Sequence, residues 1–297
     1  MTAAPVLDTA VQAREIRARR ISFDRLDQLP KHYAGDDVVM SHVVSVLSAV
    51  FPEGEDFFVR TVRNYRDQIT DPELEKQVGG FIGQEAIHGR EHRAFNDRLA
   101  ELGYPTRGID KRVGIVLRFG ERVLPKDWQL AITAALEHYT ATLAGVLLID
   151  PRAREIIADD EVRHLLLWHA LEESEHKAVA FDVFHAVSGN ERVRVNVMRF
   201  TTFGFLASGV LNTIASLAMD RSARRDPRRL LRSLRNARTS PWLTRQVRAQ
   251  IRDYNRPGFH PDDHDTTELE RHWRNELFGE GGRLADRVAR REAAPTN

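Results

Sequence analysis

WHALEESEH, residues Trp168–His176, places His169, Glu173 and His176 four and three residues apart. On an α-helix this spacing stacks the three side chains along one face. The residues that flank this face along the helix are apolar, so the face is expected to be buried. Burying a carboxylate without a partner is costly, and a metal ion is the simplest partner for a Glu between two His. The stretch therefore predicts a core helix that carries metal ligands, provided that the rest of the chain supplies matching ones.

The composition is that of a soluble globular protein. The chain has 297 residues, 42% of them hydrophobic and 29% charged, with a formal net charge of +1 and no cysteine. A near-zero net charge gives no reason to expect nucleic acid as a partner, and the lack of cysteine excludes disulfides, thiolate metal sites and cysteine nucleophiles. Apolar residues recur mostly every three or four positions, which predicts a nearly all-helical chain. The first residues lack the continuous apolar run of a signal peptide, so we expect a cytoplasmic protein.

A second helix repeats half of the motif. Asp71-Pro72 fits the cap and first position of a helix, and the apolar face of this helix is interrupted by Glu85, His88 and His92. A lone His on a buried face is usually a hydrogen-bonded core residue. Here, however, the Glu-x-x-His spacing of the opening stretch occurs again on a separate helix, and this repetition favours metal binding.

Two further helices each place one carboxylate on an apolar face. Pro52 is expected to begin a new helix after Asp37–Val50, and Glu55 lies in register with the apolar positions of that helix. The alternative for Glu55 is a first-turn acid that interacts with the helix dipole. Glu137 lies among apolar and small residues of a helix predicted from Asp127 to Ile149, where there would be room for a substrate or for oxygen. The alternative for Glu137 is a carboxylate paired with an arginine.

Together the four helices carry the ligand set of a dinuclear metal site. In di-iron and di-manganese four-helix bundles, two helices each supply one Glu and the other two each supply a Glu-x-x-His motif, as is found here. Carboxylate and imidazole ligands suit iron or manganese. We therefore predict an all-α, ferritin-like four-helix bundle as a single elaborated domain, with its core at about residues 37–187, an N-terminal arm, and further helices at about 191–280. The predicted ligands of two iron ions, with manganese as the alternative, are Glu55, Glu85, His88, Glu137, Glu173 and His176, with His169 as a seventh.

The chain resembles two groups of known proteins. His169-x3-Glu173-x2-His176 is similar to the last ligand helix of the arylamine N-oxygenases, a resemblance that covers the ligand helices only. In those enzymes the extra His ligates one iron and the pair activates dioxygen, which implies that His169 is a ligand here. A second resemblance, over about residues 15–250, is to the bacterial predicted metal-dependent hydrolases and implies a metal centre. It rests on FPEGEDFF (Phe51–Phe58), FIGQEAIHGREH (Phe81–His92) and WHALEESEHKAVAFD (Trp168–Asp182).

The residue types favour an oxidative reaction, because buried Glu and His pairs of this kind bind redox iron in helical bundles. We predict a di-iron oxidoreductase, an oxygenase or oxidase that uses O2 on an apolar or amphipathic small-molecule substrate, with an electron donor as partner and a homodimer as an open alternative. A metal-dependent hydrolase that uses a metal-bound water is the runner-up, and a non-catalytic iron-binding protein is the third hypothesis. His92 and Glu172 are predicted to orient the ligands through hydrogen bonds.

Three segments outside the ligand helices carry their own predictions. Residues 1–35 are expected to pack as an arm over the outside of the domain. Phe200–Met219 has no charged residue and is long enough to span a bilayer, but its Thr, Ser, Asn and Gly residues predict a buried helix or a lid over an apolar cavity. Arg221–Arg238 has eight Arg against one Asp. Such a stretch can lie on an anionic membrane, here the inner face of the cell membrane. A helix face exposed to solvent is the favoured interpretation, and nucleic-acid binding is the weakest of the three.

Overall fold

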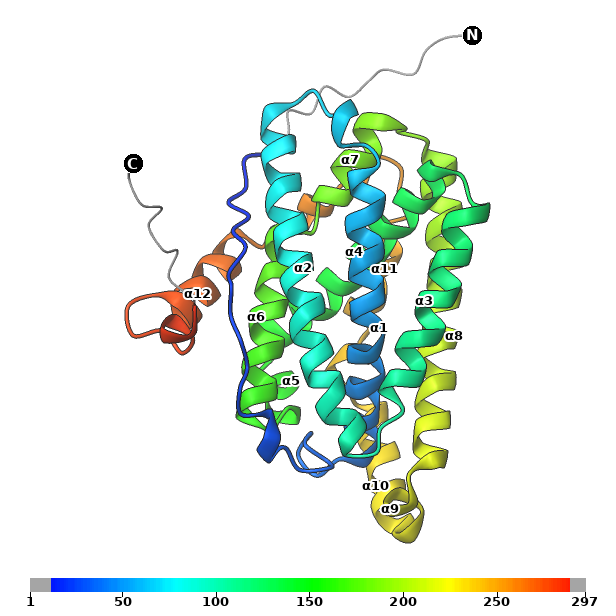
Figure 1. Ribbon diagram of the computed structural model, residues 1–297, viewed down its shortest axis with the longest axis vertical. Coiled ribbons are helices and arrows are strands. Elements are labelled where there is room, and N and C mark those ends of the chain that lie inside the picture. The colour runs from blue at the N-terminus through cyan, green and yellow to red at the C-terminus, as the bar shows by residue number, and fades with distance from the viewer. Residues whose placement is uncertain (1–11, 289–297) are drawn as a thin grey trace.

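The computed structural model describes residues 12–288, and every regular element within that range is a helix (Figure 1). The α-helices are α1 (Val38–Arg63), α2 (Pro72–Glu101), α3 (Thr106–Val123), α4 (Lys126–Ile149), α5 (Pro151–Ile156), α6 (Asp160–His176), α7 (Val179–Val187), α8 (Glu191–Met219), α9 (Arg221–Arg225), α10 (Pro227–Arg238), α11 (Arg245–Asp253) and α12 (Thr267–Phe278). Short 3-10 turns lie at Leu26–Gln28, Arg66–Gln68, Pro241–Leu243, Pro261–Asp263 and Ala285–Arg287. The all-α prediction is confirmed.

Four long helices form a bundle around the centre of the molecule. α1 packs against α2, α4 packs against α6 and its continuation α7, and α1 also contacts α4. α3 connects the first pair to the second and lies outside α1 (Figure 1). α8 to α12 follow the bundle in the chain, and α8 packs on α1 and α4. The ferritin-like assignment and the division into a single domain stay predictions.

α1 is one continuous helix, so the prediction of a new helix at Pro52 is wrong. A proline inside a helix has no N–H and leaves the carbonyl four residues earlier without its usual donor. In this protein that carbonyl belongs to Ser48, and it accepts a hydrogen bond of 2.9 Å from Nδ2 of Asn96 on α2. The α2 side chain thus replaces the missing donor, and Glu55 lies in the interior of a long helix rather than in its first turn.

The described part of the N-terminal arm, from residue 12, runs over α2 and α6 (Figure 1). The arm approaches α2 at a glycine pair that leaves no space for side chains. A Cβ on Gly80 would lie 2.4 Å from the carbonyl oxygen of Ile16, and one on Gly83 would lie 2.8 Å from Cβ of Ala18. These glycines permit close approach of the arm rather than of another helix. Residues 1–11 of the predicted arm lie outside the described residues.

α8 is not a buried helix, which corrects the prediction for Phe200–Met219. Both α4 and α8 are long and apolar enough to cross a membrane, but only 6% of the most apolar window of α8 is buried, against 44% for α4. The polar residues of α8 face the bundle: Oγ of Ser216 lies 2.6 Å from Nδ1 of His42, and Asn212 accepts a hydrogen bond from Arg112 of α3. Hydropathy identified the apolar residues correctly but not which side of the helix the protein covers.

Candidate metal centre

All seven predicted ligands meet inside the bundle, and each is buried. α1 supplies Glu55, α2 supplies Glu85 and His88, and α4 supplies Glu137. The opening stretch of the sequence lies on α6 and supplies the other three. Helix periodicity was sufficient to predict all seven residues, because each of them projects from the inward side of its helix. Their role as ligands stays a prediction.

The donor atoms form two overlapping groups. In the first, Nε2 of His176 lies 3.1 Å from Glu85 and 3.3 Å from Glu137. The second gathers Glu55, His88 and His169, and it also includes His92, which lies near enough to Glu55 and His169 to share a metal ion with them. Glu85 belongs to both groups, because its carboxylate also lies 3.7 Å from Nδ1 of His88. Oε1 of Glu173 lies between the groups, 3.8 Å from His88, 2.8 Å from His169 and 3.7 Å from His176. Two groups that share carboxylates match the donor set of a dinuclear centre.

Buried donor atoms without a partner provide the test of whether metal ions fit. Buried polar groups in folded proteins are almost always hydrogen-bonded, so each exception needs an explanation. Among the described residues, nine buried side-chain atoms of the predicted ligands make no hydrogen bond of acceptable geometry, although Nε2 of His176 lies within 3.3 Å of oxygens of Glu85 and Glu137. They are both carboxylate oxygens of Glu55, Glu85 and Glu137, Oε2 of Glu173, Nδ1 of His88 and Nε2 of His176. Oxygen and imidazole atoms that converge unpaired in a core fit divalent first-row metal ions.

His88 and His176 each use one ring nitrogen for a hydrogen bond to a residue outside the cluster of predicted ligands. Nε2 of His88 lies 3.0 Å from a carboxylate oxygen of Glu172, and Nδ1 of His176 lies 2.9 Å from Oε1 of Gln84. A ring N–H that donates outward leaves the other nitrogen of a neutral imidazole with its lone pair toward the cluster. Hydrogen bonds of this kind orient metal-binding histidines in other proteins. Glu172 therefore lies where an orienting residue was predicted.

A chain of hydrogen bonds fixes the proton positions on His169. Ser48 donates to Asn96, and its oxygen lies 2.9 Å from Nδ1 of His92, so it accepts from that N–H. Nε2 of His92 is then the acceptor for Nδ1–H of His169, at 2.6 Å. The remaining Nε2 of a neutral His169 directs its lone pair at a carboxylate oxygen of Glu173, 2.8 Å away. Two acceptors facing each other at this distance require a cation beside them, either a proton or a metal ion.

The electrostatics show how costly the cluster is without metal. Burial, together with the neighbouring carboxylates, raises the pKa of Glu55 well above its ordinary range, and burial raises the pKa values of Glu85 and Glu137 to about 8. Burial alone would lower the pKa of His176, but Glu137 and Glu173 outweigh it and raise that pKa well above its ordinary value. Protons thus supply the positive charge in the metal-free protein, and divalent cations would replace them.

The N-terminal arm contributes a buried arginine that periodicity could not reveal. Nη1 of Arg19 donates to Glu172 at 2.9 Å and to Glu175 at 2.7 Å. Gln84, which holds His176, also donates to Glu175 at 3.0 Å. Arg19, Glu175 and Gln84 therefore form one network behind both Glu-x-x-His histidines. The arm does pack over the outside of the bundle as predicted, but this residue reaches inward.

The centre is enclosed within the described part of the chain. One surface depression is lined by residues of the arm, α6 and the segment before α12, and another by residues at the ends of α1 and α3 and the start of α4. Neither is lined by a predicted ligand. Phe51, whose ring centroid lies 4.9 Å from that of His169, is half-buried, and so are residues 140–146 of α4, which follow Glu137 in the chain. The space beside Glu137 stays a prediction, but the small residues that follow Glu137 on α4 are partly exposed to solvent.

A family model described as "Predicted metal-dependent hydrolase" matches residues 17–265, most of the chain. The match confirms the resemblance found over about residues 15–250. No curated protein and no solved structure matched the chain.

The match contradicts the predicted di-iron oxidoreductase, because the family description names a hydrolase. The O2 and electron-donor partners belong to that interpretation and stay untested predictions. The error has a physical origin: buried Glu and His bind metals that serve hydrolysis as well as metals that serve redox chemistry, so the donor set selects the metal class but not the reaction.

Proposed function

The chain belongs to the predicted metal-dependent hydrolase family, and on that premise we propose that it hydrolyses a neutral ester or amide at a dinuclear metal centre. The observation that carries the proposal is the convergence of nine unpaired buried donor atoms from four helices. Bound there, divalent metal ions lower the pKa of a water molecule toward neutrality and polarise a carbonyl oxygen. The proposed ligands are Glu55, Glu85, His88, Glu137, His169, Glu173 and His176.

The carboxylates have different positions and therefore different proposed roles. Glu85 and Glu173 lie between the two donor groups and would help to hold metal ions in either group. Glu137 lies beside His176 at the edge of one group. Glu55 is the least constrained, because its nearest ion-pair contact, His169, is 3.8 Å away, whereas Glu85 and Glu137 lie 3.1 and 3.3 Å from His176. We assign Glu55 to accept the proton of the attacking water.

The charge of the site favours an uncharged substrate. Four buried carboxylates leave little positive charge after two divalent ions are bound, and a phosphate ester would bring further negative charge. Arg19 is the buried arginine nearest to the predicted ligands in the hydrogen-bond network, and its donors are already used by Glu172 and Glu175. The half-buried neighbours Phe51, Ala141 and Ala144 are apolar. A carboxylic ester or amide with an apolar acyl group suits this lining.

The donor set suits iron or manganese, and elemental analysis of the purified protein is expected to find about two metal ions per chain. The decisive assay is oxygen-free turnover of p-nitrophenyl octanoate by protein reconstituted with Mn2+ or Fe2+. Turnover should exceed that of p-nitrophenyl phosphate and should be lost with a chelator and in Glu173→Ala. Glu75→Gln, an exposed position on α2, is the matched control and should retain full activity.

Two results would overturn the proposal. One is the absence of oxygen-free hydrolysis of any ester or amide by protein that holds two metal ions. The other is hydrolysis that survives both chelation and Glu173→Ala, which would place the activity outside this centre.

A further inference from the structure

An extended apolar surface lies on the side of the molecule formed by α3 and α8. Large contiguous apolar patches are uncommon on soluble monomers and usually mark interaction sites. On α8, Phe200 and Phe203 are 71% and 76% exposed, and on α3 Val116 and Phe119 are 67% and 63% exposed. The docking face is defined by Ile115, Val116, Phe119 and Val123 of α3, Phe200, Phe203, Leu206, Val210, Leu211, Ile214 and Met219 of α8, and Leu231 and Leu234 of α10.

Arginines border this docking face at both ends of α8. Arg192 and Arg199 are exposed on the first turns of α8, before its uncharged part begins at Phe200. After its end, residues 221–238 carry eight arginines against one aspartate, in a chain whose net charge is only +1. Among the described residues, Arg228, Arg232 and Arg235 of α10 are exposed and form no ion pair, whereas Arg229 is bound to Asp36. Positive charge is therefore concentrated beside the apolar residues and left uncompensated.

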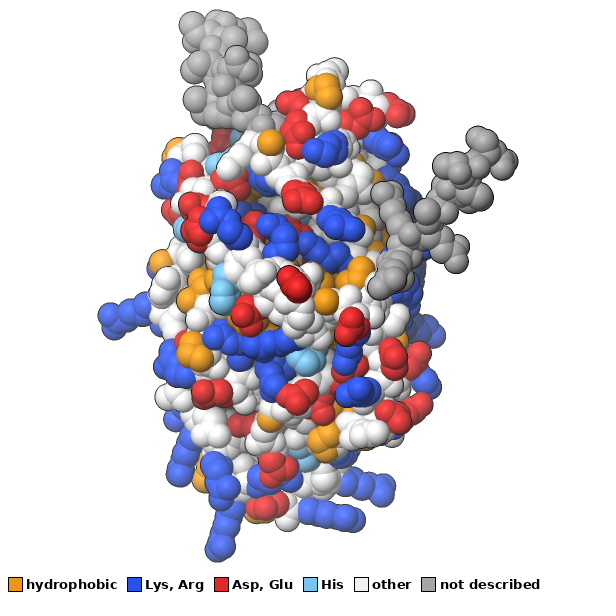
Figure 2. Space-filling model, turned by 90° about the vertical axis from the view of Figure 1, so that its left-hand side faces the viewer, with side chains coloured by type: hydrophobic (Ala, Val, Ile, Leu, Met, Phe, Trp, Pro, Cys, Tyr) orange, Lys and Arg blue, Asp and Glu red, His pale blue; other side chains and the backbone are white. Residues whose placement is uncertain are grey.

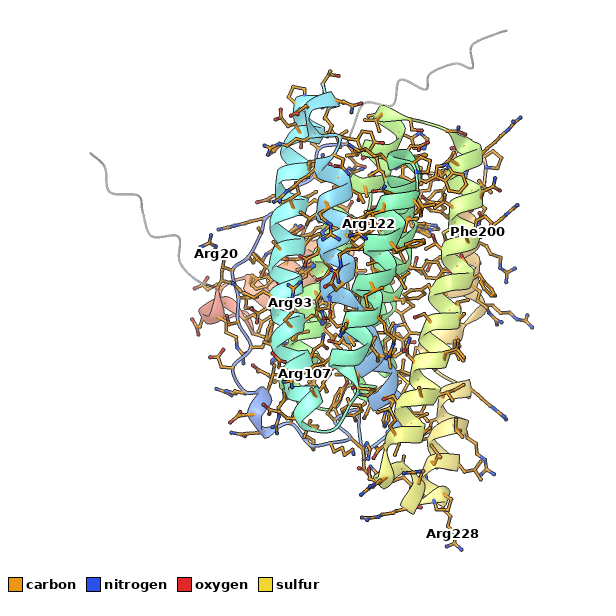
Figure 3. All side chains as sticks on the ribbon, turned by 45° about the vertical axis from the view of Figure 1, so that its right-hand side comes forward. Arg20, Arg93, Arg107, Arg122, Phe200 and Arg228 are labelled. Atoms are coloured by element: carbon orange, nitrogen blue, oxygen red, sulfur yellow. The ribbon has the colours of Figure 1, made fainter. Side chains whose placement is uncertain are left out.

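The opposite side of the molecule has a different character. Figure 2 shows the surface over the arm and α12, where blue and red side chains are intermingled and orange ones are scattered. Many of these charges pair with one another, as Arg287 does with Glu161 at 2.7 Å. Figure 3 places Phe200 and Arg228 on the α8 side and Arg20 on the other. Of these two sides, the α3 and α8 side is the one that combines large exposed apolar residues with arginines that form no ion pair.

α8 is fixed to the bundle along its inner side. The hydrogen bonds of Ser216 with His42 and of Asn212 with Arg112 join it to α1 and α3. A helix held in this way can offer its outer face to a bilayer while lying flat on the surface, with the arginines at its ends reaching the headgroups. It need not cross the bilayer.

We propose that the docking face binds the surface of an anionic lipid bilayer. The apolar side chains enter the boundary between headgroups and acyl chains, and the arginines of α8, α9 and α10 contact the anionic headgroups. In a symmetric dimer, a second copy of the chain would cover the apolar residues with the same face and would therefore bring the same arginines. The charge of the docking face therefore favours lipid. This proposal does not depend on the reaction at the metal centre.

The test is co-sedimentation of the purified full chain with vesicles of phosphatidylcholine alone or with added phosphatidylglycerol. Binding is expected only to the anionic vesicles and should fall as salt is raised. Arg228→Glu with Arg232→Glu should lower the partition coefficient at least about fivefold for each arginine. Phe203→Ser with Val210→Ser should lower it further, while Arg20→Glu, an exposed arginine on the opposite side, changes one charge in the same sense and should have little effect. Circular dichroism confirms that each variant is folded.

Several results would overturn the proposal. Equal binding to neutral vesicles would remove the role of the arginines, and no binding at low salt would remove the bilayer. An Arg20→Glu effect as large, for each charge, as that of Arg228→Glu would indicate general charge attraction rather than a docking face. If the lipid-free protein were a dimer that Val210→Glu dissociates, and if it bound no vesicles, the partner on this face would be a second copy.

Discussion

Replacing Glu137 by Gln should make the metal-free protein more stable at pH 8, although it removes a native interaction partner. Glu137 is fully buried, and its burial, together with the charges of Glu173 and Glu85, raises its pKa to about 8 from an ordinary value near 4.5. An acid with a raised pKa in the folded state contributes its full stability below about pH 4.5 and loses it as the pH rises toward 8. At pH 8 the loss is on the order of 4 kcal/mol for this single group. Gln has nearly the same shape and no charge, so it avoids the loss.

The same substitution should have the opposite effect on metal binding. A glutamine at this position cannot supply a negative carboxylate, so affinity should fall by at least the roughly 10- to 100-fold seen when residues that merely orient ligands are changed. A stabilising effect without metal together with weakened binding of metal distinguishes a ligand from an ordinary core residue. A core Glu that made only structural hydrogen bonds would lose stability in both states.

The assay is urea unfolding of wild type and Glu137→Gln in excess chelator at pH 6.5 and pH 8, followed by titration of each protein with Mn2+. The exposed Glu75→Gln on α2 is the control for the loss of one negative charge. The stability of the wild type should fall between the two pH values, and that of Glu137→Gln should fall less. The reasoning is refuted if Glu137→Gln is less stable than wild type at pH 8 without metal, or if it binds metal as tightly.

Three further changes test the surroundings of the centre. Arg19→Met should cost about 3 kcal/mol or more in urea unfolding, because it leaves the buried carboxylate of Glu172 without its arginine, while Glu175 keeps only Arg274. A cost below about 1 kcal/mol would mean that the arm arginine is dispensable. Gly80→Ala should expose the arm to limited proteolysis, because the new Cβ would meet the carbonyl of Ile16. At Gly79 a new Cβ would have no atom within 4 Å, so Gly79→Ala should stabilise α2 by about 1 kcal/mol. Equal effects of the two substitutions would contradict this prediction. Chelation, monitored by scanning fluorimetry, should lower the melting temperature more at pH 8 than at pH 6.5. The reason is that the pKa of Glu85 also lies at about 8, so its stabilising contribution without metal is lost as the pH rises through that value. A decrease that is the same at both pH values would count against a cost of burying this charge.

The ligand helices could be predicted because their signal is local. Helix periodicity puts residues three and four apart on one side, so Glu85 and His88 identify their own face without any knowledge of the fold. The prediction that these four helix faces meet in one bundle rested on the repeated Glu-x-x-His motif, not on an argument about helix packing. The continuity of α1 through Pro52 could not be predicted, because the group that satisfies the freed carbonyl, Asn96, lies on another helix.

α8 shows a limit of a different kind. Its apolar composition correctly indicates that the helix should be covered, but composition does not say by what. The polar side chains that argued against a membrane-spanning helix, Asn212 and Ser216 among them, turn out to face the bundle and hold the helix there. The same residues that argued for a buried position therefore explain why the apolar side points outward.

The arm explains why a list of predicted ligands does not by itself define a metal centre. Each Glu-x-x-His histidine needs a partner that fixes its ring, and those partners, Glu172 and Gln84, are held in place directly or through Glu175 by Arg19. Arg19 lies in a segment without helical periodicity, among several other arginines, and nothing local distinguishes it. The docking of the arm at Gly80 and Gly83 is thus part of the centre, because it delivers the positive charge that binds Glu172 and Glu175 and so helps to keep two imidazoles aligned. Metal affinity should accordingly depend on glycines that touch no ligand, and variants at the arm contact should weaken metal binding even where every predicted ligand is intact.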